Sequence, residues 1–263
     1  MIKNELIKCI HRKRFKITIL IICILLFLQF IFYTISIYGS TSIELLPQTQ
    51  MGFIHGAKLR GCFHFLIIVM PLFSFSLFSD SYLTEKENDT HSLYFTRLSA
   101  KNYLLYKGIA IVIINFCVSF ILLSFYEISI WIATPDIGVL SGYGLPAYQM
   151  ISIHDPVLFD SFAVGMPHLY NLFIIALFSL LSVCEGVIGY SLSLVIDRIK
   201  PVYMYSYLFI GFNLINIIVP LEYQITMFIQ TYPATIKQFL TTIILWIILT
   251  VGLLLIGVYK KHE

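Results

Sequence analysis

The sequence predicts an all-α integral membrane protein with six transmembrane helices. Hydrophobic residues make up 59% of the 263 residues, and charged residues only 12%. Soluble globular domains carry about 25% charged residues, so this chain has too few to cover a water-facing surface. It also lacks the polar, highly charged tracts that characterise disordered chains. Soluble enzymes and disordered proteins are therefore excluded.

The predicted helices follow from the length of the apolar stretches, because a helix needs about 20 apolar residues to cross a bilayer. The first stretch follows a basic start, as in a signal peptide. It is longer than the 7–15 residues typical of such peptides and precedes no small-residue cleavage site, so we expect it to be retained. The predicted transmembrane domain, residues 17–263, has helices at 17–38, 61–79, 108–132, 169–196, 202–219 and 239–259.

The distribution of lysine and arginine predicts the orientation, because cytoplasmic loops carry an excess of these residues. Only Lys58, Arg60 and Lys237 fall on one side of the predicted helices. The remaining fourteen of the seventeen fall on the other side: Lys3, Lys8, Arg12, Lys13, Arg14, Lys16, Lys86, Arg97, Lys101, Lys107, Arg198, Lys200, Lys260 and Lys261. We therefore expect a multi-pass protein of the cytoplasmic membrane with both termini in the cytoplasm. The net charge of +3 reflects this topology and does not indicate a nucleic-acid partner.

Three segments outside the spans have a character of their own. Residues 1–16 place apolar side chains on one helical face, which predicts an amphipathic helix in the inner headgroup layer; these are Ile2, Leu6, Cys9 and Ile10. Residues 133–168 form a long outer loop without lysine or arginine, a length that is usually functional or flexible. Residues 220–238 contain Pro220 and Pro233 and are too short to cross, which predicts a broken or re-entrant segment before the sixth helix.

The connection over residues 80–107 is the most informative polar stretch. It concentrates charge just inside the predicted membrane boundary, at Asp80, Glu85, Lys86, Glu87 and Asp89. A helix beginning near Asp89 or Thr90 would place Leu93 on an apolar ridge beside this acidic flank. Such a short cytoplasmic helix could dock in a groove on a soluble partner. The alternative is a solvated run of charges that only sets the topology.

This connection resembles that of the permease subunits of ABC type-2 transporters. Those permeases have an acidic residue ending helix two, then Glu-Lys-Glu-x-Gly-Thr, a serine-containing turn and a lysine opening helix three. The matching residues here are Asp80, Glu85, Lys86, Glu87, Thr90, Ser99 and Lys107. Asp89 stands where the family usually has glycine, and the proline common before the serine-containing turn is absent. The departures concern the local turn, whereas the order of charged residues matches.

The resemblance implies that this segment holds a coupling helix that sits in a cleft of an ATP-binding subunit. The residues expected to couple are Asp80, Glu85, Lys86, Glu87, Thr90, Leu93, Arg97 and Lys107. It also implies two ATPase chains and a second permease, identical or not. Because the sequence has no Gly-x-x-x-x-Gly-Lys-Ser/Thr loop, ATP and magnesium are expected in the partner and no cofactor in this chain.

Ionisable residues within the predicted spans are a second set of candidates, since they are costly in lipid and should face the bundle interior or water. Glu127, Glu185 and His64 could line a substrate path or relay protons, and Glu127 and His64 could pair if their helices touch. The alternative is a hydrogen-bonded carboxyl that joins helices. No metal site is expected, because neither the five cysteines nor His154, Asp155, Asp160 and His168 have a ligand spacing.

The leading hypothesis is an exporter permease for an amphipathic substrate, such as a bacteriocin-like peptide or a lipid. Seventeen tyrosines and twenty-two phenylalanines suit such a cargo, but they also suit lipid-facing belts. Roles linked to copper, sodium or other small ions are also open for such permeases. Two other classes remain: an intramembrane enzyme using Glu185, Glu127 and His64, and a passive immunity or scaffold protein that needs no ATPase.

Overall fold

The computed structural model describes residues 1–39, 60–88, 99–133, 166–196, 200–220, 223–229 and 235–262. Every regular element among these residues is a helix. Five of the helices are long and apolar enough to cross a membrane. The predicted class, an all-α membrane protein with several spans, is therefore confirmed. Most of the predicted outer loop 133–168 and the residues 89–98, with Thr90, Leu93 and Arg97, lie outside the described part of the chain.

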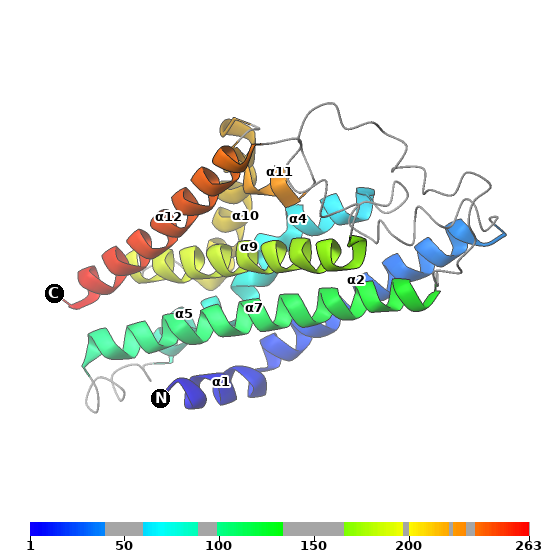
Figure 1. Ribbon diagram of the computed structural model, residues 1–263. Coiled ribbons are helices and arrows are strands. Elements are labelled where there is room, and N and C mark those ends of the chain that lie inside the picture. Colours follow the sequence, from blue (N-terminus) through cyan, green and yellow to red (C-terminus); the bar gives the residue numbers. More distant parts are fainter. Residues whose placement is uncertain are drawn as a thin grey trace.

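The N-terminal half comprises two helices joined at one residue and a composite helix (Figure 1). These elements are α1 (Ile2–His11), α2 (Lys13–Ile37), α4 (Arg60–Ser74), the π-helix η1 (Phe75–Ser79) and α5 (Ser81–Glu87). Arg12 separates α1 from α2 because its backbone is extended, with φ −67° and ψ 133°. The expected 1–16 helix therefore ends at His11, and the first membrane helix begins earlier than expected.

The C-terminal half comprises α7 (Ala100–Ala133), α9 (Pro167–Val195), α10 (Pro201–Ile218), α11 (Ile225–Ile229) and α12 (Ile236–His262). Prolines open α9 and α10, where the fixed φ suits a helix start. Helix α7 begins at Ala100, eight residues before the predicted span 108–132, so Lys107 lies inside a helix. The length of an apolar stretch indicates only the part of a helix that lies within lipid. The backbone hydrogen bonds of α7 continue before that part, toward its N-terminus.

The predicted fifth span coincides with α10, whose 18 residues extend about 27 Å. It is shorter than the five helices of full spanning length. The predicted broken segment contains α11, a helix of five residues that packs against α9 and α12. The buried side chains Ile225, Phe228 and Ile229 make this contact part of the core.

Helix α9 is the central element of the fold. It packs against α4, η1, α5, α7, α10, α11 and α12, as Figure 1 shows for its neighbours α7 and α12. Small residues allow this close packing, as they do in other membrane bundles. A Cβ at Gly186 would lie 2.6 Å from Nδ2 of Asn115, and one at Gly189 would lie 2.7 Å from Cδ2 of Phe75. The absence of a side chain at Gly186 and Gly189 therefore allows α7 and η1 to approach α9 closely.

Candidate functional site

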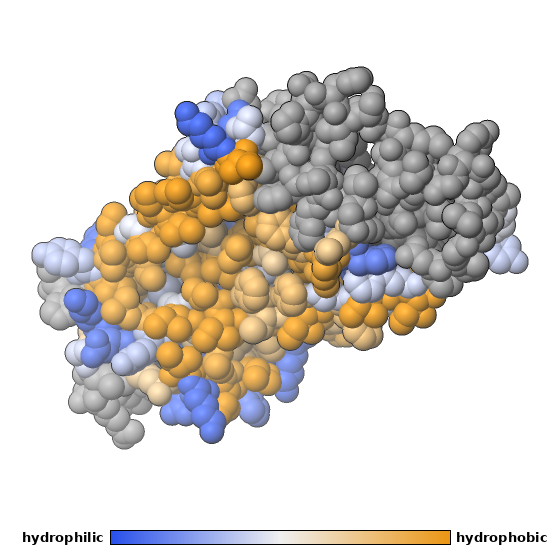
Figure 2. All heavy atoms as spheres, viewed as in Figure 1, coloured by the Kyte–Doolittle hydropathy of each residue, from blue (hydrophilic) through white to orange (hydrophobic). Residues whose placement is uncertain are grey.

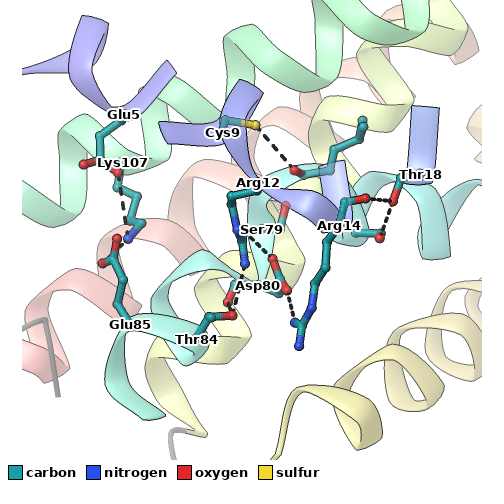
Figure 3. A network of polar contacts seen from close by, with 12 residues as sticks. Glu5, Cys9, Arg12, Arg14, Thr18, Ser79, Asp80, Thr84, Glu85 and Lys107 are labelled. Atoms are coloured by element: carbon teal, nitrogen blue, oxygen red, sulfur yellow. Dashed lines mark hydrogen bonds and ion pairs between the residues drawn. The ribbon is translucent and has the colours of Figure 1, made fainter. Parts of the chain in front are cut away.

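A cluster of buried ion pairs lies where α1 and α2 meet the end of η1 and the start of α5 (Figure 3). Asp80 follows η1 directly and is fully buried. Arg12 donates to its Oδ1 at 2.8 Å, and Arg14 donates to its Oδ2 at 2.6 Å. Each carboxylate oxygen thus has its own guanidinium, which is what a buried charge requires. Asp80 therefore fastens the junction of α1 and α2 to the start of α5.

The backbone around Asp80 explains how it reaches both arginines. The extended conformation at Arg12 ends α1 and separates the two arginine side chains. On the other side, the π-helix widens the last turn before Asp80, and Ser79 donates its hydroxyl to the Ser74 carbonyl at 3.2 Å. Single π-turns within α-helices are frequent at functional sites. Arg12 also donates to Oγ1 of Thr84 at 3.1 Å, which extends the contact into α5.

A second buried pair links α5 to α7. Lys107 is completely buried, forms an ion pair with Glu85 and donates to the Tyr103 hydroxyl at 2.9 Å. The Tyr103 hydroxyl in turn donates to Glu85. Burial opposes the charge of Glu85, but the Lys107 ammonium and the hydrogen bonds from Lys107 and Tyr103 outweigh it and lower the pKa of Glu85. Glu85 is therefore held as a carboxylate.

Helix α1 completes this cluster with two further charges. Glu5 is buried, and its Oε1 accepts from Lys8 at 2.7 Å. Its Oε2 lies 3.9 Å from the Lys107 ammonium, while Lys8 lies 3.8 Å from Glu85. Cations and carboxylates thus alternate around a ring that joins α1, α5 and α7. We call Glu5, Lys8, Glu85 and Lys107, together with Asp80 and its two arginines, the ion cluster.

The sequence predicted only part of the ion cluster. It missed Glu5, Lys8, Arg12 and Arg14 as site residues, and also Tyr103 beside them. Glu5 and Cys9, which lie four residues apart, form the buried face, whereas Ile10 is 55% exposed. A carboxylate four residues from a buried cysteine was the available signal, because those positions share one side of a helix. Burial raises the pKa of Cys9 to about 12, so it stays a thiol, and it donates to the Leu77 carbonyl at 3.5 Å.

The predicted coupling residues separate into an inner and an outer group. Asp80, Glu85 and Lys107 come together inside the protein. Lys86 is half-buried and Glu87 is exposed at the end of α5. The inner residues therefore bind other helices of this chain. Glu87 is available to a partner.

The two intramembrane carboxylates lie in separate places. Glu185 is buried on α9 and accepts from the Ser74 hydroxyl at 3.1 Å. Glu127 accepts from Nε1 of Trp131 at 2.9 Å and from Nδ2 of Asn171 at 2.7 Å. Asn171 and Glu185 are about four turns apart on α9, roughly 20 Å. Glu127 is thus joined to α9 and Glu185 to α4, far from one another, and His64 lies half-buried on α4.

Further hydroxyl and amide groups surround Glu185. The Ser74 and Ser182 hydroxyls lie 3.0 Å apart, and Ser119 donates to Ser182 at 3.0 Å. Ser182 also donates to Oδ1 of Asn115 at 3.5 Å. This hydroxyl network connects α4, α7 and α9 within the bundle. Among the described residues no three His, Cys, Asp or Glu side chains come together as a metal ion would require, and His168 packs edge-on against Trp131.

Comparison of the chain with family models, with curated proteins and with solved structures finds no match.

Proposed function

We propose that this chain is the transmembrane permease subunit of an ABC exporter that moves an amphipathic substrate. A separate ATP-binding subunit, in two copies, would drive it, and a second permease would complete the pathway. The observation that carries this proposal is the ion cluster. It involves Asp80, Glu85 and Lys107, the inner members of the segment that resembles type-2 permeases, and it fixes that segment to three other helices.

The ion cluster supports coupling because it makes α5 mechanically continuous with the membrane helices. A force on the end of α5 would pass through Asp80 to α1 and α2, and through Glu85 to α7. Breaking a buried ion pair by losing one partner costs about 3–5 kcal/mol. The pairs therefore resist separation when α5 is displaced. In this scheme Asp80, Glu85 and Lys107 position the helix, and Glu87 faces the ATPase.

The arrangement of the termini supports six crossings with the ion cluster in the cytoplasm. Both termini lie at the same end of the bundle, together with α5 and the start of α7 (Figure 1). An even number of crossings brings both termini to the same end. The number is even, six, when the shorter helix α10 is counted with the five longer helices. The excess of lysine and arginine at that end favours a cytoplasmic position for it.

The test is co-purification from the native host in mild detergent, followed by mass spectrometry. We expect a stoichiometric partner that carries a Gly-x-x-x-x-Gly-Lys-Ser/Thr loop and hydrolyses ATP. The variant Glu87→Arg should reduce its recovery at least fivefold while leaving the unfolding temperature of the chain unchanged. The control is Lys237→Glu, which reverses the charge of an exposed residue at the beginning of α12. It should leave recovery of the ATPase unchanged.

Glu87 is chosen for the decisive variant and Glu85 is left unchanged, because a change at Glu85 would break the ion cluster. A chain that purifies without any nucleotide-binding protein would overturn the proposed function. Equal recovery of the ATPase with Glu87→Arg would instead overturn the assignment of Glu87 to its contact surface.

A further inference from the structure

A groove of about 620 Å³ lies between the start of α7 and the end of α12. Its volume is within the range of small-molecule sites, about 300–1,000 Å³. Most of its wall is apolar, and two of its side chains, Leu255 and Ile256, are more than half exposed. The lining residues are Lys101, Leu105, Leu255, Ile256, Val258 and Tyr259.

The groove is closed at its inner end by close packing of the two helices. The position of a Cβ at Gly108 lies 3.4 Å from Cδ1 of Leu254. The lining residues of α7 precede Gly108, and those of α12 follow Leu254, so the groove extends from this contact toward the helix ends. An apolar chain in it would lie along the membrane-facing side of the bundle with its end at the aqueous boundary.

Cationic and amphipathic groups mark that boundary. Lys101 lines the groove and is exposed, and Tyr259, also in the lining, is 69% exposed. The first hydrogen bond within α7 runs from Tyr103 N–H to the Ser99 carbonyl, so the preceding amides have no acceptor in the helix itself. Lys260 follows Tyr259 and is also exposed. Tyrosine is enriched at membrane interfaces, and basic pockets between helices bind anionic headgroups.

We propose that this groove binds an anionic phospholipid, with one acyl chain along the apolar wall and the headgroup phosphate at Lys101. Charge complementarity selects this occupant, since none of the described residues that line the groove is acidic and Lys101 is basic. A second copy of the chain would instead bring its own basic end to the same place. Hydrophilic side chains border the apolar surface at the end of the molecule where both termini lie (Figure 2). The inference is independent of the proposed transport function.

Native mass spectrometry of the full chain, with defined lipids added in mild detergent, tests the headgroup contact. Phosphatidylglycerol should bind more tightly than phosphatidylcholine with the same acyl chains. Lys101→Gln should weaken phosphatidylglycerol binding about fivefold, the usual effect of one basic residue near an anionic membrane surface. Lys237→Gln, which removes an exposed cation at the other end of α12, should leave binding unchanged. Equal binding of the two lipids, or equal losses in the two variants, would overturn the proposal.

A second pair of variants tests the acyl chain. Leu255→Trp fills the groove and should reduce lipid binding, whereas Ile247→Trp adds the same bulk at a half-exposed position of α12 outside the groove and should have no effect. Glycerol phosphate, the headgroup without chains, should bind far more weakly. Binding of glycerol phosphate as tight as that of phosphatidylglycerol would identify a site for free anions. A dimer that excludes the lipid would identify an interface between copies. Either result would overturn the proposal.

Discussion

The ion cluster and the hydroxyl network around Glu185 bury carboxylates by different means. In the ion cluster, Asp80 lies between two guanidinium groups and Glu85 is paired with an ammonium. In the hydroxyl network, Glu185 accepts a hydrogen bond from a serine. The first arrangement depends on opposite charges that pair with one another and lies near the ends of the helices. The second lies within the bundle and depends on hydrogen bonding and close packing. The two regions should therefore respond differently to the same kind of substitution.

The largest effect is expected for Asp80→Asn, which preserves shape but removes the charge. Arg12 and Arg14 would then face an amide whose nitrogen cannot accept a hydrogen bond. We expect the free energy of unfolding to fall by roughly 3 kcal/mol, the low end for a broken buried pair, because Arg14 is 49% exposed. Denaturation by SDS, followed by circular dichroism, measures this change. The control is Glu87→Gln at an exposed position, and equal stability of the two variants would contradict the role of Asp80.

The next effect is expected for Lys107→Met, which leaves Glu85 and Glu5 without their buried cation. Lys8 remains close to both, so we expect a loss of about 2 kcal/mol. The double variant Lys107→Met with Glu85→Gln should be less destabilised than the two separate losses added together. A double-mutant cycle in the same denaturation assay measures this coupling. Simple additivity would show that the two side chains act independently.

Stability should also depend on pH through Glu85, whose pKa is lowered in the folded protein. A carboxylate with a lowered folded pKa stabilises the fold fully above its unfolded pKa, about 4.3. This contribution is lost as the pH falls through the lower, folded pKa. The unfolding temperature should therefore fall on acidification below about pH 4.3. In Glu85→Gln the slope should be smaller, and an unchanged slope would exclude Glu85 as its source.

The sequence was most informative where the physical signal was local. Apolar length located the membrane helices, and the resemblance to type-2 permeases singled out Asp80, Glu85 and Lys107 among eight residues expected to couple. It did not reveal Arg12 or Glu5, because their partners lie more than sixty residues away in the chain and no local pattern records that pairing. The burial of Lys107 was not predicted for a related reason. A fully buried lysine, here Lys107, is rare unless it is paired, and its partner is defined only by the tertiary fold.

Close packing in the hydroxyl network can be tested at Gly186. An alanine there would place its Cβ 2.6 Å from Nδ2 of Asn115, whose amide is held by the Ile111 carbonyl at 3.0 Å. We expect Gly186→Ala to destabilise by about 1–2 kcal/mol, as overpacking of cores does. Gly211→Ala is the matched control, because nothing lies within 4 Å of a Cβ at Gly211. A more stable Gly186→Ala would show that Asn115 moves aside without cost.

The smallest effect is expected for Glu185→Gln, the isosteric counterpart of Asp80→Asn. The amide oxygen can accept from Ser74 as the carboxyl does, and Ser182 lies beside Ser74 to receive hydrogen bonds from neighbouring donors. Because the Ser74 and Ser182 hydroxyls are uncharged, replacing the Glu185 carboxyl with an amide leaves no cation without a partner. We expect a change below about 1 kcal/mol, the net value of one neutral hydrogen bond. A loss as large as that of Asp80→Asn would show that Glu185 is bound through its charge, and the distinction between the two regions would then fail.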